Sequence, residues 1–152
     1  IGIPDSVLKK PGPFTPDERQ TMNRHAAIGA SILGKSRIEL FQLASEIALT
    51  HHERWDGQGY PNQLAGEDIP LSGRIVAVVD FYDALTMNRV YRPAFSHEKV
   101  LEMLMAERGR AFDPAIVDCF MRSNIAMSAV RERVTNQQMT FSDLIQNEPV
   151  NP

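Results

Sequence analysis

The feature that most limits how this chain can fold is a series of apolar segments with helical spacing, each opened by residues that start helices. The first begins at Thr15, which can cap a helix, with Pro16 suited to the first helical position and Glu18 completing a capping box. We expect this helix to end near Leu33, with Gly34 as its C-terminal stop.

The same kind of signal recurs along the rest of the chain. Ser36 and Glu39 form a second capping box, ahead of a helix with apolar residues at helical spacing that runs into His51 and His52. The other expected elements are a loop with one helical turn over 1–14, a helix from Ser72, a helix from Ser96 to about Glu107, a helix from Asp113 to about Asn124 and an extension or further helix over 125–134.

Only the segment RIVAVVDFY, residues 74–82, is rich enough in β-branched residues to be a buried strand instead. The chain has no second strand-like run with which it could pair, so we interpret it as a helix. The predicted fold is therefore all-α, a compact helical bundle. We expect 1–124 to form the body of one domain and 125–152 to form a C-terminal helix and tail.

Charge and cysteine content limit the possible partners and compartment. The net charge of -3 argues against a broad surface for a nucleic-acid polymer, although a few arginines could still hold a small anion. The single cysteine, Cys119, excludes an internal disulfide framework and fits a reducing compartment. No apolar run approaches the roughly 20 residues of a membrane span. We therefore expect a cytoplasmic protein with no membrane segment in this chain.

The segment 54–71 is a long loop, because glycines and prolines interrupt it throughout. Loops longer than about 12–15 residues in compact domains are usually functional or disordered. This length predicts a functional loop directly after the histidine pair.

His51 and His52 lie side by side at the end of an apolar helix. Neighbouring residues on a helix point about 100° apart, so the pair would serve one metal ion poorly and two adjacent ions well. For either histidine alone, stabilisation of the helix C-terminus is the simpler explanation. The pair together with Glu53 and Asp56 favours a metal site.

Asp80 is flanked by apolar residues in the middle of a predicted helix. Burying an unpaired carboxylate costs several kcal/mol, so Asp80 would need a metal ion or a salt bridge to Arg74 or Arg89. We favour the metal ion for Asp80. Asp83, one turn later, lies closer to the polar end of the helix, and for it we favour the salt bridge.

The two other histidines have simpler explanations in local sequence. His25 lies among small and apolar residues on the first helix, as a satisfied core histidine would. It becomes a candidate ligand only because a site made of His51, His52 and Asp80 lacks ligands. His97 follows a helix cap and is expected to face solvent.

Two arginines and a tyrosine are candidates for binding a substrate. Arg89 and Arg92 are three residues apart and could bracket an anionic group, since guanidinium pairs with phosphate in a bidentate fork. A solvated surface is the alternative for both. Tyr60, fixed between Gly59 and Pro61, could place its ring against a base or its hydroxyl near a phosphate, or could simply pack.

The run HHERWDGQGYP, residues 51–61, resembles the signature H-H-E-x-x-D-G-x-G-Y-P of HD-GYP domains, a subgroup of the HD superfamily of metal-dependent phosphohydrolases. It matches the signature at every specified position, and the resemblance extends over roughly residues 1–120. The resemblance implies an all-helical fold of the HD type. Active HD-GYP domains hydrolyse cyclic di-GMP, a bacterial second messenger, to the linear dinucleotide and in some cases to GMP. They use two or three divalent metal ions, often iron or manganese.

The resemblance also implies roles for individual residues. Those that match the family's metal ligands are His25, His51, His52 and Asp80. Those that match positions near the substrate are Arg89, Arg92 and Tyr60.

Four further residues of the motif, together with Asp83 on the helix of Asp80, are expected to support the site. Glu53 and Asp56 would orient the histidines or fix the loop. Gly57 and Gly59 would let that loop turn tightly.

The His-Asp pair that defines the family, and a lysine that follows it closely, precede the segment matching IGIPDS and are absent from this chain. We expect these residues, and a sensor or receiver domain, upstream of Ile1. The isolated chain is expected to bind metal weakly and to lack activity.

Two alternatives to the phosphodiesterase remain. The domain could be catalytically silent and use the 54–71 loop to dock a partner such as a diguanylate cyclase domain, or it could hydrolyse another phosphoester. The presence of all four candidate ligands in this chain favours the enzyme.

Overall fold

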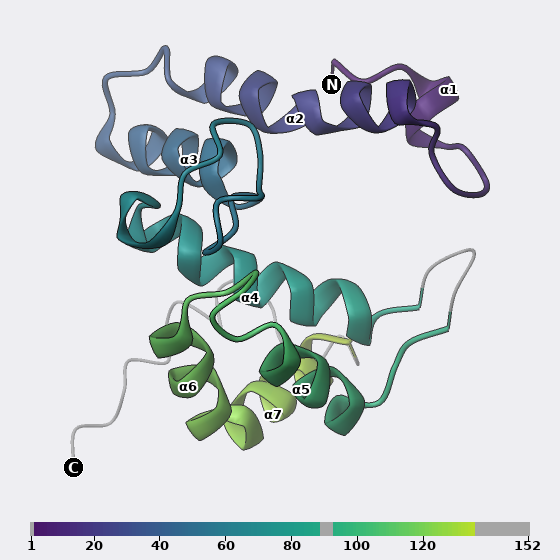
Figure 1. Ribbon diagram of the computed structural model, residues 1–152, viewed down its shortest axis with the longest axis vertical. Helices are drawn as coiled ribbons and strands as arrows, with labels where there is room; N and C mark the ends of the chain where they lie inside the picture. Colours follow the sequence, from purple (N-terminus) through teal and green to yellow (C-terminus); the bar gives the residue numbers. More distant parts are fainter. Residues whose placement is uncertain (1, 89–92, 136–152) are drawn as a thin grey trace. The chain divides into compact units, whose positions relative to one another are not determined.

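The computed structural model describes residues 2–88 and 93–135, and in these ranges it contains seven α-helices, one 3-10 helix and no β-strand (Figure 1). The predicted all-α fold is therefore confirmed for the described part of the chain. The elements are α1 (Asp5–Leu8), α2 (Pro16–Leu33), α3 (Glu39–Thr50), η1 (Gly66–Asp68), α4 (Leu71–Thr86), α5 (His97–Ala106), α6 (Pro114–Arg122) and α7 (Asn124–Thr135). None of the described helices is long and apolar enough to cross a membrane.

The predicted helix starts at Thr15 and Ser96 are confirmed. The Thr15 hydroxyl accepts a hydrogen bond from the Glu18 N–H (3.3 Å), and the Glu18 carboxylate accepts one from the Thr15 N–H (2.7 Å). This reciprocal pair satisfies two of the amide groups that a helix start leaves unpaired. Ser96 caps α5 by accepting from the Lys99 N–H (3.3 Å).

The predicted capping box of Ser36 and Glu39 is wrong. Ile38 is the N-cap of α3 and makes no side-chain cap, while the Ser36 hydroxyl accepts a hydrogen bond from the Ile38 N–H (3.2 Å). Ser36 therefore organises the turn before α3, and Glu39 becomes the first helical residue. Local competition of this kind is common, because serine can bond to nearby backbone outside a helix as easily as at its start.

Helices α2 and α3 pack as an antiparallel pair. The Ser45 hydroxyl of α3 donates to the Ala30 carbonyl of α2 (2.9 Å), and further along the pair Gly29 faces Ala48. Small residues at these positions allow the two helices to approach closely. Because the two helices run in opposite directions, residues before Ala30 in α2 lie beside residues after Ser45 in α3. His25 therefore lies near the end of α3, where the histidine pair is.

Helix α4 lies between the α2–α3 pair and α5 (Figure 1). Gly73 of α4 sits against the Thr50 side chain at the end of α3, where no larger residue would fit. Val78 of α4 and Leu104 of α5 are fully buried. These contacts bring the end of α3, the middle of α4 and the end of α5 around one region of the domain.

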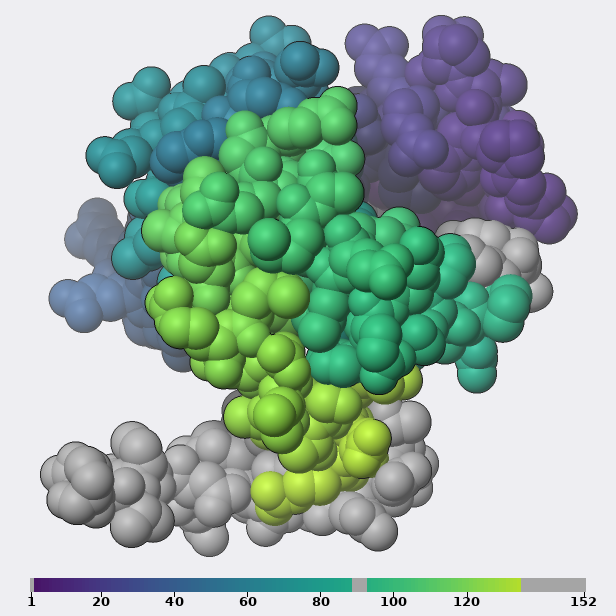
Figure 2. Space-filling model, turned by 60° about the horizontal axis from the view of Figure 1, so that its bottom comes forward, coloured from purple at the N-terminus to yellow at the C-terminus, as the bar shows by residue number. Residues whose placement is uncertain are grey.

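The turn after α5 is attached to the loop after α3. The Trp55 N–H donates to the Ala111 carbonyl (3.0 Å) and the Asp56 N–H donates to the Arg110 carbonyl (2.8 Å). The space-filling view shows this turn, in green, lying against the blue and teal segment that contains the loop (Figure 2). Two segments more than 50 residues apart in sequence are thus joined beside the histidine pair.

The chain divides into two compact units, Ile1–Asp118 and Cys119–Pro152. In the described part of the second unit, the Ser123 N–H bonds to the Cys119 and Phe120 carbonyls (3.2 and 3.0 Å), which ends α6 one residue before α7 begins. The predicted division of the chain near residue 124 stays a prediction.

Candidate metal centre and its pocket

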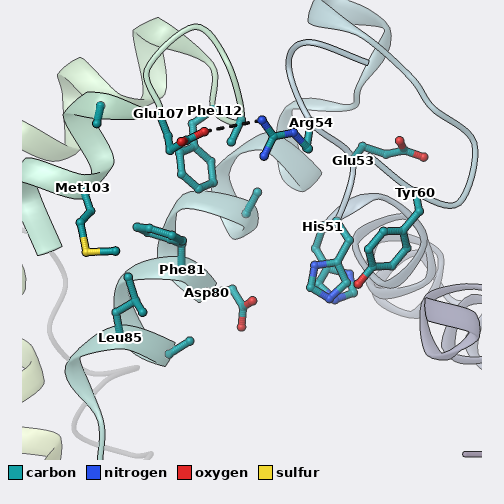
Figure 3. Close-up of a pocket in the computed structure, with 15 residues that line it drawn as sticks. His51, Glu53, Arg54, Tyr60, Asp80, Phe81, Leu85, Met103, Glu107 and Phe112 are labelled. Carbon is teal, nitrogen blue, oxygen red and sulfur yellow. Dashed lines mark ion pairs between the residues drawn. The ribbon is translucent and has the colours of Figure 1, made fainter. Parts of the chain in front are cut away.

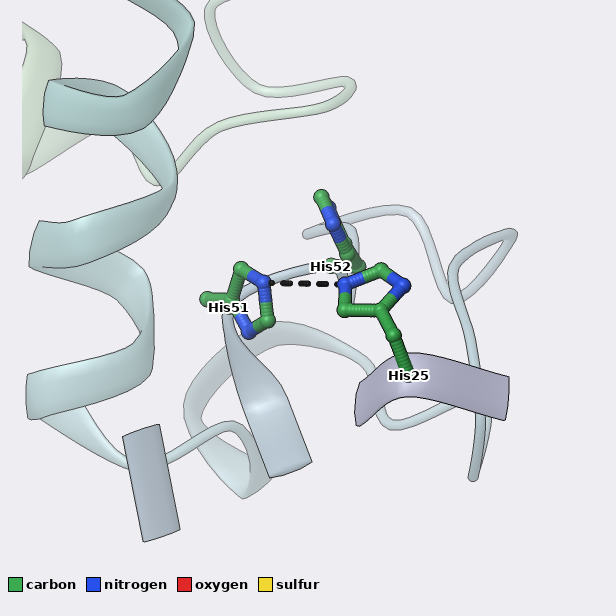
Figure 4. Close-up of side chains that lie close together, drawn as sticks. All are labelled: His25, His51 and His52. Atoms are coloured by element: carbon green, nitrogen blue, oxygen red, sulfur yellow. Dashed lines mark hydrogen bonds between the residues drawn. The ribbon is translucent and has the colours of Figure 1, made fainter. Parts of the chain in front are cut away.

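Three histidines converge at the end of the α2–α3 pair (Figure 4). One ring nitrogen from each of His25, His51 and His52 lies within 4.8 Å of the others. The Nε2 atoms of His25 and His51 are 3.4 Å apart. The structure therefore brings together three of the four predicted metal ligands, and this cluster could hold a metal ion.

Backbone hydrogen bonds fix which nitrogen of two of these rings is available. His25 Nδ1 lies 2.7 Å from the Met22 carbonyl, and His51 Nδ1 lies 3.0 Å from the Ala48 carbonyl. A carbonyl can only accept, so each Nδ1 carries the proton and each neutral ring presents a lone pair at Nε2. Two lone pairs 3.4 Å apart do not attract each other, whereas a cation near both would be bound by both.

The third ring is also held in the form that binds metals. The pKa of His52 is lowered to about 4, mainly by burial and to a smaller extent by the neighbouring imidazoles of His51 and His25. His52 is therefore neutral at pH 7, and neutral imidazole is the form that coordinates a metal ion. The chemistry of this donor set fits a divalent transition metal.

Tyr60 packs against the histidine cluster. Its ring centroid lies 4.8 Å from that of His52, with the two planes tilted by 35°. Burial is the main cause that raises the pKa of Tyr60 to about 12, with a smaller contribution from Asp80. Tyr60 therefore keeps its proton at neutral pH and can donate a hydrogen bond to an anion in this region.

Glu53 holds the loop that carries Tyr60. Its side chain is only 3% exposed, and its carboxylate accepts hydrogen bonds from the Asn62 N–H (2.7 Å) and the Leu64 N–H (3.1 Å). The Tyr60 N–H donates to the His52 carbonyl (3.1 Å). Of the two roles predicted for Glu53, the contacts support fixing the loop, because its carboxylate is hydrogen-bonded to loop amides.

The Asp56 carboxylate is hydrogen-bonded at the start of the loop. Arg54 binds it through two parallel hydrogen bonds (3.0 and 2.8 Å), and the Gln58 N–H donates to it as well (3.1 Å). The hydrogen bond from Arg54 is the largest cause that lowers the pKa of Asp56. Asp56 thus keeps Arg54 in one position at the start of the loop.

The two glycines predicted to permit the tight turn occupy positions that require glycine. Gly57 has a φ of +75°, in the left-handed region that residues with a Cβ rarely adopt. Gly59 lies so close to the backbone of Glu53 and Arg54 that an added Cβ would overlap it. The loop therefore folds directly back onto the turn that follows the histidine pair.

Asp80 differs from its expected environment. The sequence suggested a buried carboxylate, but the side chain is exposed and lines a pocket in front of the histidines (Figure 3). Asp80 is exposed because it lies on a different face of α4 from the buried residue Val78. The carboxylate oxygens of Asp80 are not part of the three-histidine cluster, and its role as a metal ligand stays a prediction.

The remaining predicted residues are distributed as follows. Asp83 is exposed and does not line the pocket. Arg89 and Arg92 lie outside the described residues, so their predicted contacts to phosphate stay predictions. His97 does not simply face solvent as expected, because its Nδ1 lies 2.8 Å from the hydroxyl of Tyr82, a residue only 4% exposed.

The pocket has a volume of about 610 Å³ and two chemically different sides (Figure 3). One side, which we call the histidine wall, consists of His51, His52 and Tyr60. The opposite side, the apolar wall, consists of Phe81, Leu85, Met103 and Phe112. Asp80 lies between the two walls, and Arg54 and Glu107 lie at the rim.

The apolar wall was not anticipated from the sequence. Its residues come from α4, α5 and the turn before α6, and Phe81 and Phe112 meet edge to face with centroids 5.0 Å apart. At the rim, the Arg54 guanidinium lies 3.5 Å from the Glu107 carboxylate. The only local signal was Gly109 after the predicted helix end, which marks a turn but does not say what the turn contacts.

Comparison with known proteins agrees with this arrangement. The sequence pattern of a family described as HD domain matches residues 1–116. The chain belongs to the HD domain family. This HD domain includes all three clustered histidines and both walls of the pocket.

Relatives of this HD domain are named as phosphodiesterases. A cyclic di-GMP phosphodiesterase of Vibrio cholerae is 52% identical over 126 residues, which is 80% of this chain and 26% of the relative. A 3'3'-cGAMP-specific phosphodiesterase 2 of the same organism is 46% identical over 131 residues, which is 86% of this chain and 25% of the relative. The chain thus spans about a quarter of the length of these curated relatives.

A solved structure supports the fold. The crystal structure of a cyclic GMP-AMP specific phosphodiesterase of Vibrio cholerae superposes with a TM-score of 0.58 at 23% identity, over 97% of this chain and 32% of the other. At this identity the similarity is evidence for the fold alone. The described residues of this chain are all-α, as the sequence predicted.

Docking of a diguanylate cyclase domain on the 54–71 loop stays a prediction.

Proposed function

We propose that this HD domain is the catalytic part of a metal-dependent phosphodiesterase that hydrolyses cyclic di-GMP to the linear dinucleotide, to GMP or to both. The observation that carries the proposal is the convergence of His25, His51 and His52, with the Nε2 atoms of His25 and His51 3.4 Å apart. Membership of the HD family and the names of its relatives support the same reaction class.

The three histidines would hold the metal, with Asp80 as a further ligand from α4. Two or three divalent ions, iron or manganese, fit imidazole and carboxylate donors. When bound, such ions polarise phosphoryl oxygens and lower the pKa of water toward neutrality. An upstream His-Asp pair and lysine are part of this proposal, as is a sensor or receiver domain.

The chain's own residues would prepare this site in three ways. The carbonyls of Met22 and Ala48 orient His25 and His51 by accepting from Nδ1. Burial keeps His52 neutral. Tyr60, protonated at neutral pH, would donate its hydroxyl proton in a hydrogen bond to a phosphate oxygen.

Two more residues would act on the substrate's charge. We assign Arg89 and Arg92 to the phosphate groups, because guanidinium binds phosphate through two parallel hydrogen bonds. Together with the Tyr60 hydroxyl they would position a phosphodiester in front of the histidine wall.

The test is hydrolysis of cyclic di-GMP by the full-length protein and its His51→Ala variant, with products separated by chromatography. Loss of a ligand should lower turnover by about a hundredfold or more, since even residues that only orient ligands are worth about 10–100-fold. His97→Gln is the matched control, because His97 is outside the cluster. Unchanged turnover in His51→Ala would contradict the proposal.

A further inference from the structure

We propose that the apolar wall, with Arg54 and Glu107 at its rim, is a subsite for a guanine base. This inference rests on the proposed function, because it assigns the part of the pocket beyond the histidine wall to the base of a nucleotide substrate. It goes further by naming the groups that distinguish guanine from adenine.

The shape and lining of the pocket suit a flat aromatic group. Its volume of about 610 Å³ lies in the range of about 300–1,000 Å³ that small-molecule sites occupy. Phe81, Met103 and Phe112 supply an apolar surface of the kind on which bases stack. Because the same pocket is lined by His51 and His52, a phosphate at the histidine wall would leave its base beside the apolar wall.

The rim carries opposite charges side by side. The nearest oxygen of Glu107 is 3.5 Å from Arg54 Nη2, and both side chains keep about a third of their surface exposed. A partly exposed ion pair of this kind contributes little to folding stability. Since this ion pair adds little to stability, we ask whether the two groups at the pocket mouth bind a ligand.

Guanine complements this pair. Along its edge, two donors (N2–H and N1–H) adjoin two acceptors (O6 and N7), and a carboxylate accepts while a guanidinium donates. Adenine presents an acceptor at N1 where guanine presents a donor, so it would place a lone pair against the Glu107 carboxylate. An adjacent acid and arginine thus match guanine and oppose adenine.

The Arg54 side chain and the backbone of Glu107 are held in place before any ligand arrives. Asp56 binds Arg54 through two hydrogen bonds and leaves its other guanidinium donors available. Glu107 begins a tight turn, in which its carbonyl accepts from the Arg110 N–H (3.0 Å) and the Phe112 N–H (3.2 Å). Groups fixed in advance lose less freedom on binding, which favours selectivity.

The experiment measures binding of GMP and AMP to the full-length protein by titration calorimetry. The two nucleotides carry the same phosphate, so their difference reports the base alone. We expect GMP to bind at least about tenfold more tightly, in line with the discrimination of good paired contacts to a base edge. Equal affinities for GMP and AMP would overturn the proposal.

Variants identify the groups responsible. Glu107→Gln should weaken GMP binding by about tenfold without weakening AMP binding, because an amide can also pair with adenine. The matched control is Glu102→Gln, on the helix that ends just before Glu107, where the carboxylate bonds to exposed Lys99 (2.9 Å) outside the pocket. Equal loss of both nucleotides in Glu107→Gln would refute base selection by this residue.

A variant that fills the pocket from an exposed position tests the subsite without unfolding the domain. Ala106 is exposed and lines the pocket, so Ala106→Trp should obstruct it without disturbing the core. GMP affinity should fall about tenfold with unchanged circular dichroism, and full GMP binding would contradict the assignment. If the proposed hydrolysis fails while the GMP preference stands, only the proposed function is lost, because binding is measured without turnover.

Discussion

The two walls of the pocket are each held by a buried carboxylate, but the two carboxylates act over very different distances in sequence. Glu53, 3% exposed, accepts from the amides of Asn62 and Leu64, which belong to its own loop. Asp113, 5% exposed, receives Arg74 Nη1 at 2.7 Å from α4, 39 residues earlier. The histidine wall is therefore fixed locally, whereas the apolar wall depends on a contact between distant segments.

This difference indicates that the two walls can be disturbed separately. Loss of Glu53 should loosen the loop that places Tyr60 over His52. Loss of Asp113 should release the turn from α4 and leave the imidazoles, which are oriented by helix carbonyls, in place. The predictions below test this separation.

The largest effect is expected for Asp113→Ala. This change leaves the Arg74 guanidinium, 17% exposed, without its acidic partner and removes the acceptor for the Ala115 N–H (2.8 Å). We expect the free energy of unfolding in urea to fall by about 3–5 kcal/mol, the usual cost of breaking a buried pair. Asp113→Asn, which keeps an acceptor for the amide, should lose less.

A loss below about 1 kcal/mol in Asp113→Ala would show that the ion pair does not anchor the apolar wall. If the folded variant also lost metal affinity, the two walls would not be independent.

A somewhat smaller loss is expected for Glu53→Ala. Two backbone amides at Asn62 and Leu64 would lose their acceptor, at about 1–3 kcal/mol for each group left buried and unpaired. Because the loop can relax toward water, we expect about 2–4 kcal/mol in total, measured by urea unfolding. Glu53→Gln retains one carbonyl oxygen and should lose about half as much.

Glu53→Ala should retain the preference for GMP, whereas Asp113→Ala should lose it, because Glu53 holds the loop of Tyr60 and Asp113 holds the turn that carries part of the apolar wall. Stability equal to wild type would contradict the role of Glu53 in holding the loop.

The smallest effect concerns pH in the metal-free protein. The pKa of His52 is lowered from 6.5 to about 4, chiefly by burial, so the unfolded chain binds more protons than the folded one between these values. The free energy of unfolding should therefore decrease as pH falls from 6.5 to 4, by about 1–2 kcal/mol once solvent screening of this partly exposed ring is considered.

Urea unfolding at several pH values in the presence of a chelator measures this slope, and His52→Gln should reduce it. A stability that stays constant or rises toward pH 4 in wild type would show that His52 is not held neutral.

The sequence predicted the features that depend on neighbouring residues. The Thr15 and Ser96 caps, the helix that ends at the histidine pair and the glycine-dependent loop are all local patterns. Ser36 failed as a cap because its hydroxyl can accept either from the Glu39 N–H, as a cap would, or from the Ile38 N–H, as it does in the structure. The sequence does not decide between these two hydrogen bonds.

The remaining features depend on packing. Asp80 was expected to be buried because its neighbours are apolar, yet burial depends on which face of α4 meets the other helices. His97 pairs with Tyr82 across α4 and α5, and the apolar wall joins three separate segments. His25 shows the same limit, since only the antiparallel packing of α2 and α3 places it beside His51.

The most direct test of the metal centre is manganese binding by the full-length protein, stripped of metal and titrated in a calorimeter. His25→Ala is the decisive variant, because its local sequence looks like that of a core residue and only the fold makes it a ligand. We predict that His25→Ala weakens manganese binding by about a hundredfold or more, and that His97→Gln leaves it unchanged. Equal manganese affinity in wild type and His25→Ala would contradict the assignment of the three-histidine cluster as the metal site.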